Sequence, residues 1–325
     1  TSAAVIKQGL APDGGLFVPE RIPRLSEGDL TALREMDYIH RAAFVLGLYL
    51  TDYTEEELIA AAARAYNAPR FPAQGPAPLR RVDGGLMLEL WHGPTCAFKD
   101  MALQIMPQLL SLALEKTGER RDARILVATS GDTGKAALEG YADTERVSIH
   151  VFYPNEGVSR IQRKQMATQK GGNVRVTAIR GNFDDAQNGV KAIFADAEIR
   201  KELDARGVFL SSANSINWGR LVPQIVYYVS AYCDAVECGA LRMGEKLDVA
   251  VPTGNFGNIL ACYLAGRMGV PIGKLVCASN RNNVLTDFIN TGVYDRRRKF
   301  FATVSPSMDI LISSNLERLL YFAAG

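Results

Sequence analysis

The sequence predicts an α/β fold built on mostly parallel β-sheets that are flanked by helices. Short apolar runs typical of buried strands alternate with helical patterns along most of the chain, which favours a parallel sheet with helices on both faces. Two of these runs lead directly into glycine-rich loops that are followed by helices. With 325 residues, the chain is long enough for about two domains.

The first part of the chain is expected to be a separate helical unit. Thr54 and Glu57 have the spacing of a capping box, which predicts a helix that begins after Thr54. Residues 67–81 contain four prolines, at positions 69, 72, 76 and 78, and they predict an extended connection to the rest of the chain.

Strands and helices alternate after this connection. The predicted strands are residues 125–128, 147–153, 174–179, 247–251 and 274–278. A helix is expected between the capping residue Ser159 and the pair Gly171–Gly172, another from Asp184 on, and a third that ends near Gly269. Ligands of such sheets bind at the carboxyl ends of the strands, so the chemistry is expected in the loops there.

Composition argues against several classes of protein. The 37 basic and 35 acidic residues give a net charge of +2, which offers no positive field for binding nucleic acid. The three His residues lack metal-ligand spacing, so no metal is expected. The most apolar long run, Leu221–Cys233, is too short to cross a bilayer, and no membrane is expected. An odd count of five Cys residues without a pairing pattern favours a reduced, cytoplasmic protein in which all five are small buried side chains.

Lys99 lies in WHGPTCAFKDMALQ (residues 91–104), which is otherwise mostly small or apolar. If a helix begins after Thr95, Lys99 falls on an apolar stripe with Leu103, Met106 and Leu110. Asp100 then falls on the polar face with Gln104, Gln108 and Ser111, as a solvated and structural neighbour. A lysine on the packed side has a lowered pKa and forms Schiff bases with carbonyl compounds. The alternative is a surface lysine whose stem alone is packed.

The first glycine-rich loop follows the predicted strand 125–128. Backbone N–H groups of small residues at a helix start converge on anions, which predicts an anion site at Ser130, Gly131, Asp132, Thr133 and Gly134. An ATP-binding phosphate loop is excluded, because Thr129 and Ala136 stand where it requires a glycine and a hydroxyl residue. A tight turn without a ligand remains the alternative.

The second glycine-rich loop follows the predicted strand 247–251. It predicts another anion site, at Gly254, Asn255, Phe256, Gly257 and Asn258. Its spacing differs from the dinucleotide-binding pattern G-x-G-x-x-G, so a single phosphate group suits it better than a pyrophosphate. A packed lysine, a site for a small carboxylate and a site for one phosphate together point to pyridoxal 5′-phosphate acting on an amino acid.

Four segments resemble the threonine synthase family, a group of fold-type II pyridoxal-phosphate enzymes: ELWHGPTCAFKDMALQ, ATSGDTGKAALEG, SSANSINWGRLVPQIVYY and VPTGNFGNILACYLA. GLAPDGGLFVPE near the start and SPSMDILISSNLERLL near the end resemble the same family. The six segments occur in register, and the resemblance covers nearly the whole chain.

The resemblance implies two open α/β domains with the cofactor between them. An N-terminal extension would span residues 1–75 and the smaller domain residues 93–212, and the larger domain would combine residues 76–92 with 213–325. Lys99 would form the internal Schiff base, residues 254–258 would bind the cofactor phosphate, and residues 130–134 would lie beside the substrate carboxylate. The implied reaction converts O-phospho-L-homoserine and water to L-threonine and phosphate, and no obligate protein partner is implied.

The substrate phosphate would need a cation. Arg160 and Arg220 are the candidates, each with surface solvation or a structural ion pair as its alternative role. Asn155, Asn214 and Asn217 are weaker candidates for the same role.

Members of the family usually begin before a segment like the start of this chain and continue beyond a segment like its end. The residue that meets the pyridine nitrogen is therefore expected beyond residue 325. The chain is expected to be truncated at both ends.

Other functions remain open at this stage. A different fold-type II lyase, such as a phospholyase or a serine or threonine dehydratase, would share the lysine and both loops. A catalytically incomplete fragment that acts as a binding module is the other alternative.

Overall fold

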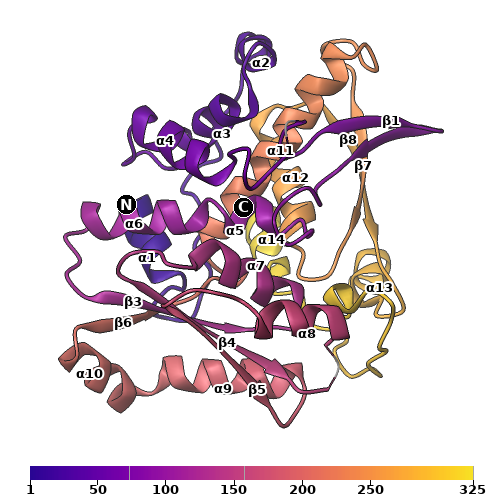
Figure 1. Cartoon of the computed structure of the whole chain (residues 1–325). Coiled ribbons are helices and arrows are strands. Elements are labelled where there is room, and N and C mark those ends of the chain that lie inside the picture. Colours follow the sequence, from indigo (N-terminus) through magenta and orange to yellow (C-terminus); the bar gives the residue numbers. More distant parts are fainter. Residues whose placement is uncertain (73, 157, 325) are drawn as a thin grey trace.

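The computed structural model describes residues 1–72, 74–156 and 158–324 (Figure 1). Ala73 of the predicted connection, Gly157, and Gly325 at the end of the predicted larger domain lie outside the described residues. The fold is α/β with parallel sheets flanked by helices, as predicted. The predicted division into an N-terminal extension and two α/β domains stays a prediction.

The N-terminal part is helical. Its helices are α1 (Ser2–Gln8), α2 (Glu27–Arg34), α3 (Tyr38–Gly47) and α4 (Glu55–Ala65). The capping box is confirmed, because Thr54 and Glu57 exchange side-chain and backbone hydrogen bonds at the start of α4. The connection leads into an antiparallel hairpin that the sequence did not predict, formed by β1 (Leu79–Val82) and β2 (Gly85–Leu88).

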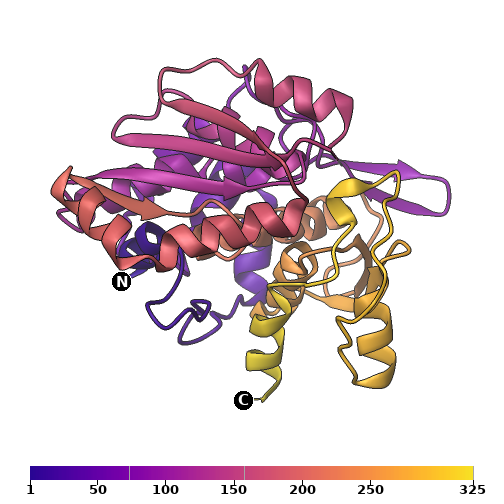
Figure 2. The same cartoon turned by 90° about the horizontal axis from the view of Figure 1, so that it is seen from below.

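A four-stranded parallel sheet forms the middle of the chain, in the order β5-β4-β3-β6. Its strands are β3 (Asp122–Ala128), β4 (Val147–Pro154), β5 (Val174–Ile179) and β6 (Val208–Ser211), of which the short β6 was not predicted. The connecting helices are α7 (Asp132–Tyr141), α8 (Arg160–Ala167), α9 (Phe183–Ala195) and α10 (Ala197–Ala205). Figure 2 shows α9 crossing one face of this sheet, and α7 packs on the opposite face.

Helix α8 begins where the sequence predicted but ends early. The Ser159 hydroxyl accepts a hydrogen bond from the N–H of Gln162, as an N-cap should. The helix ends at Ala167 with Thr168 as its C-cap, so the predicted end at Gly171–Gly172 is wrong. Glycine often occurs at helix ends, but here Gly171 and Gly172 lie in the turn between the helix and β5.

Strands β7 (Leu247–Pro252) and β8 (Ile272–Ala278) form a second parallel pair, and α12 (Gly257–Met268) connects them along the chain. Helix α12 ends at Met268, near Gly269 as predicted, because Gly269 adopts a left-handed conformation with φ of 112° as the C-cap. The long α11 (Trp218–Glu237) is almost wholly buried and packs against α12, α3 and α5. The chain continues through α13 (Val284–Thr291), the short 3₁₀ helix η1 (Pro306–Met308) and α14 (Leu316–Ala324).

The lysine segment forms two short helices, α5 (Asp100–Leu103) and α6 (Met106–Lys116). The predicted single helix beginning after Thr95 is therefore wrong in its start and in its continuity. Pro107 explains the break, because proline has no N–H to donate to the carbonyl of Leu103 and its ring crowds that carbonyl. The backbone of α7 packs there instead, with Gly140 directly against the Leu103 carbonyl oxygen.

The cysteines are only partly as expected. Cys233 and Cys262 are buried and Cys277 is half-buried, whereas Cys96 and Cys238 are exposed, so the expectation that all five are buried is wrong. Cys96 is exposed because it lies in the irregular turn before α5, where its φ is 56°. Among the described residues, no helix is long and apolar enough to cross a membrane.

Candidate active site

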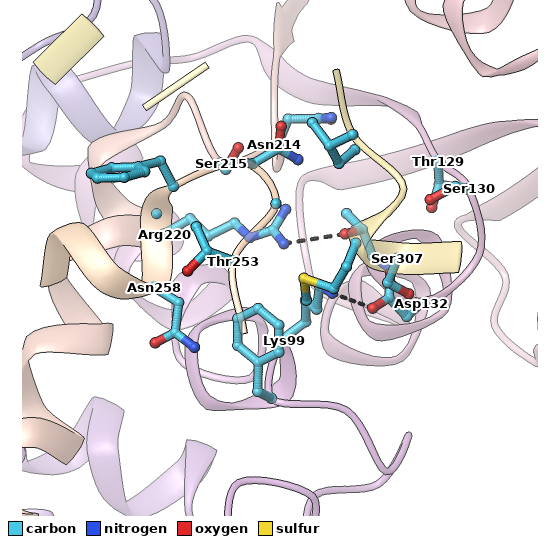
Figure 3. A pocket seen from close by; sticks show the side chains of 18 of the residues that line it. Lys99, Thr129, Ser130, Asp132, Asn214, Ser215, Arg220, Thr253, Asn258 and Ser307 are labelled. Atoms are coloured by element: carbon cyan, nitrogen blue, oxygen red, sulfur yellow. Dashed lines mark hydrogen bonds and ion pairs between the residues drawn. The ribbon is translucent and has the colours of Figure 1, made fainter. Parts of the chain in front are cut away.

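A cavity opens at the carboxyl ends of β3 and β7 (Figure 3). It is lined by residues from six separate parts of the chain, including both glycine-rich loops. Of the predicted site residues, those that line it are Lys99, Ser130, Asp132, Thr133, Arg220, Gly254, Asn255, Phe256, Gly257 and Asn258. The structure therefore brings predicted site residues from segments far apart in the chain to one cavity.

Lys99 immediately precedes the first residue of α5, and its side chain is only 7% exposed, so the predicted packed position is confirmed. Its ammonium forms an ion pair with the carboxylate of Asp132 and lies 4.3 Å from the ring centroid of Phe98. Burial lowers the pKa of Lys99, and the charge of Asp132 opposes this shift only in part. A lysine whose pKa is lowered by burial is better able to act as a nucleophile or a base.

Asp100 is fully buried, so the prediction of a solvated neighbour is wrong. Its carboxylate accepts hydrogen bonds from the backbone N–H of Thr95 at 2.9 Å and from the Thr95 hydroxyl at 2.8 Å. The helix starts at Asp100 rather than after Thr95, which turns this polar face toward the preceding loop instead of toward water. Burial raises the pKa of Asp100. The two hydrogen bonds with Thr95 hold this loop against α5, which is a structural role.

The first glycine-rich loop is held in shape by Thr129, which the sequence analysis had not included in the site. The Thr129 hydroxyl accepts hydrogen bonds from the N–H groups of Gly131 at 3.0 Å and Gly134 at 2.8 Å. Neither glycine lines the cavity, but Gly131 adopts a φ of 142° that side-chain-bearing residues avoid. The loop therefore presents the side chains of Ser130, Asp132 and Thr133 to the cavity.

The second glycine-rich loop turns its carbonyl groups away from the cavity. The Gly254 carbonyl accepts a hydrogen bond from the Ser313 hydroxyl at 2.6 Å, and the Asn255 carbonyl accepts one from the N–H of Asn315 at 3.1 Å. Phe256, at the start of α12, has a left-handed φ of 65° and provides no side-chain cap. Within the described part of the chain, the N–H groups of residues 254–259 have no acceptor. Such a helix start is a binding site for a phosphate.

Asn258 is oriented by two tyrosines of α11. Its side-chain oxygen accepts hydrogen bonds from the hydroxyls of Tyr227 at 2.5 Å and Tyr228 at 2.7 Å. Burial raises the pKa of both phenols well above the usual value, so both remain donors. Because the oxygen faces the tyrosines, the amide NH₂ group faces the cavity (Figure 3).

Arg220 of α11 is a buried cation beside the first loop. Its guanidinium donates to the Ala213 carbonyl at 2.9 Å and to the Thr133 hydroxyl at 3.2 Å. Burial lowers the pKa of Arg220 to about 10, so it stays charged at neutral pH. No carboxylate of the described residues lies within 4.0 Å of it. The charge of Asp132 acts on Arg220 from farther away, but a buried cation without a direct ion pair is costly, which favours an anionic ligand at this place.

The remaining candidates lie elsewhere or have structural contacts. Arg160 is exposed at the start of α8 and does not line the cavity, and Asn155 is also exposed. Asn214 does line it, and its amide donates to the Ala128 carbonyl at 3.3 Å. Asn217 is buried away from the cavity, where it caps α11 and donates to the Ile6 carbonyl at 3.0 Å.

Family models match almost the entire chain. The model described as "Threonine synthase N terminus" matches residues 1–66, and the model described as "Pyridoxal-phosphate dependent enzyme" matches residues 70–320. The crystal structure of a PLP-bound threonine synthase from Brucella melitensis superimposes with a TM-score of 0.89 at 40% identity, covering 100% of this chain and 67% of that one. The chain belongs to the threonine synthase family of pyridoxal-phosphate-dependent enzymes.

Other members of the threonine synthase family are similar over the same length. Human threonine synthase-like 1 is 46% identical over 99% of this chain and 44% of its own length. The threonine synthase of Pseudomonas aeruginosa is 43% identical over 98% of this chain and 65% of its own length. The chain thus spans less than half of the human relative and about two-thirds of the bacterial one.

Pyridoxal phosphate is the cofactor of this threonine synthase family member. The described residues fit it, because a buried amine, Lys99, faces the same cavity as the unpartnered N–H groups of residues 254–259.

Several lining residues were missed by the sequence analysis. The most distant are Ser307, Met308 and Ile310, which close the cavity from the segment around η1. They follow no strand-to-helix loop, and only the resemblance of SPSMDILISSNLERLL to the family singled out this segment. Other missed lining residues are Phe98, Thr129, Ser215, Gln224, Pro252 and Thr253.

Proposed function

We propose that this protein converts O-phospho-L-homoserine and water to L-threonine and phosphate, with pyridoxal phosphate as its cofactor. The observation that carries the proposal is the buried, charged guanidinium of Arg220, which faces the cavity without a carboxylate partner among the described residues. Together with two loops suited to anions, it makes a site for a substrate that bears a phosphate as well as a carboxylate. The similarity to bacterial threonine synthases supports the same substrate class.

The binding roles follow from the donors that each part of the cavity offers. The N–H groups of residues 254–258 bind the cofactor phosphate, and Lys99 bonds to the cofactor aldehyde. Ser130 and Thr133 have hydroxyl groups that can donate to the substrate carboxylate, whereas the carboxylate of Asp132 cannot. Arg220 binds the substrate phosphate with its fork of N–H donors.

The chemistry requires a base and a site for the leaving phosphate. Bound pyridoxal phosphate withdraws electrons from the bonds at the substrate α-carbon. Lys99 then accepts the α-proton, for which its lowered pKa suits it, and it can return a proton at the γ-carbon. A second proton leaves the β-carbon as the phosphate leaves the γ-carbon, and Arg220 stabilises the leaving phosphate. After the γ-carbon is protonated, water adds at the β-carbon and the α-carbon regains its proton. Burial of Lys99 limits side reactions by restricting water near the amine.

Product analysis tests this function. The cofactor-loaded protein is incubated with O-phospho-L-homoserine, and threonine, phosphate and 2-oxobutanoate are measured together. Equal amounts of threonine and phosphate support the proposal. Phosphate with 2-oxobutanoate identifies a phosphate-eliminating lyase instead, and binding of the cofactor without turnover identifies a binding module.

A further inference from the structure

The Lys99 ammonium and the Asp132 carboxylate form a buried ion pair at the edge of the cavity (Figure 3). Their side chains are 7% and 12% exposed, and they come from the starts of two helices, α5 and α7, that pack against each other. Lys99 comes from the segment of residues 91–104, whereas Asp132 comes from the first glycine-rich loop. Burying two charges is costly unless their mutual attraction and further hydrogen bonds compensate for the lost hydration.

Both oxygens of the Asp132 carboxylate are engaged. One pairs with Lys99, and the other accepts a hydrogen bond from the N–H of Thr133 at 2.7 Å. The Ser307 side chain of η1 lies near the carboxylate and helps to lower the pKa of Asp132. The carboxylate is therefore fixed in orientation before any ligand binds, and it points at the lysine at the edge of the cavity (Figure 3).

We propose that Asp132 is a positioning residue for Lys99: in the cofactor-free protein, its carboxylate pairs with the Lys99 ammonium and orients it at the cavity edge. The proposal rests on the proposed function only in giving Lys99 the role of binding the cofactor. It gives Asp132 a role distinct from the rest of its loop, because a carboxylate repels the substrate carboxylate that this loop is expected to meet. It also implies that removing the carboxylate changes the proton affinity of one named lysine.

The sign of that change follows from the groups that face the pair. Lys99 faces Asp132 from α7 and Arg220 from α11, and Arg220 in turn faces the phenols of Tyr141 and Tyr227. Burial raises the pKa of both phenols, so they are uncharged at neutral pH. Burial and Arg220 lower the pKa of Lys99, and Asp132 is the group that raises it. Asp132→Asn therefore lowers the pKa of Lys99 further.

Competitive acetylation of the cofactor-free protein measures this effect. Acetic anhydride is applied over a range of pH values, and mass spectrometry quantifies the peptide that contains Lys99. In Asp132→Asn we expect the midpoint of Lys99 reactivity to move to lower pH. Below both midpoints, the reactivity rises about tenfold for each pH unit of the shift. Asp132→Glu, which restores a carboxylate, is expected to recover part of the wild-type midpoint.

Glu139→Gln is the matched control. It also converts an acid to an amide on α7 and breaks the ion pair between Glu139 and Lys135, which measures 2.8 Å, but it leaves Lys99 untouched. An unchanged Lys99 midpoint in Asp132→Asn, or an equal shift in Glu139→Gln, overturns the proposal. Circular dichroism checks that each variant is folded, and Asp132→Ser carries the same test if Asp132→Asn does not fold.

This experiment uses no substrate, so its outcome is independent of the product assay. A shifted Lys99 midpoint in a protein that makes no threonine supports the role of Asp132 and refutes the proposed reaction. An unshifted midpoint in a protein that makes threonine does the reverse.

Discussion

Arg220 donates a hydrogen bond from its guanidinium to the hydroxyl of Thr133, at 3.2 Å, and this contact joins α11 to the first glycine-rich loop. A second bond, to the Ala213 carbonyl at 2.9 Å, fixes the other side of the guanidinium. The cation is thus held in place by neutral groups, and its charge remains available to a ligand. The two arginines suggested by the sequence differ in this respect, because Arg160 is exposed and outside the cavity.

Arg220→Lys tests which arginine binds the substrate phosphate. The variant keeps a positive charge but loses the forked donors, so we expect kcat/KM for O-phospho-L-homoserine to fall about 100-fold or more, mainly through KM. Inhibition by L-homoserine, which lacks the phosphate, should change little. Arg160→Ala is the control and should leave both measurements near those of the wild type. If Arg160→Ala raises KM and Arg220→Lys does not, Arg160 binds the substrate phosphate and Arg220 does not.

Lys99→Ala tests the covalent attachment of the cofactor. Borohydride reduction of the loaded wild-type protein should fix pyridoxal phosphate to the peptide that contains Lys99, as detected by mass spectrometry. Lys99→Ala should lose this label and all turnover, because no other lysine lines the cavity described. Lys135→Ala is the control, since Lys135 pairs with Glu139 on the same loop-helix unit and should retain the label. A label on any other lysine would contradict the role of Lys99.

Local patterns predicted the parallel strands, the two loops and the packed position of Lys99, because each depends on periodicity or on glycine at a helix start. The same reasoning failed for Asp100, since it assumed an ideal helix after Thr95 and did not account for the break caused by Pro107. The contact of Ser307 with Asp132 depends on two segments brought together only by the fold. Likewise, no local sequence pattern indicates that Arg220 is buried whereas Arg160 is exposed.

Gly140→Ala tests the close packing that supports the lysine segment. A Cβ atom at Gly140 would overlap the carbonyl oxygen of Leu103, which belongs to the backbone and cannot rotate away. We expect the free energy of unfolding to fall by about 1–3 kcal/mol, measured by urea denaturation. Gly189→Ala is the control: it lies in α9, and no atom lies within 4 Å of its added Cβ. That variant should gain about 0.5–1 kcal/mol from helix propensity, and a loss of the same size in both variants would argue against the packing explanation.

Glu119→Gln tests an ion-pair cluster that joins α1 to the start of β3. Glu119 accepts hydrogen bonds from Lys7 at 3.1 Å and from the guanidinium of Arg121 at 2.7 and 2.9 Å. The hydrogen bond from the Arg121 side chain is the main reason that the pKa of Glu119 lies well below its usual value. A carboxyl group with a lowered pKa stabilises the fold above its unfolded pKa, and this stability is lost as the pH falls toward the folded pKa.

The wild-type protein should therefore lose stability as the pH falls below about 4.5, the ordinary pKa of glutamate. Glu119→Gln should be less stable at pH 7 by about 1–3 kcal/mol and should lose less on acidification, because the amide does not titrate. Denaturant unfolding at a series of pH values measures both effects. Glu115→Gln, on the neighbouring exposed turn of α6, is the control and should follow the wild-type curve. Parallel acid profiles for Glu119→Gln and the wild type would show that the cluster does not link α1 to the sheet in the folded protein.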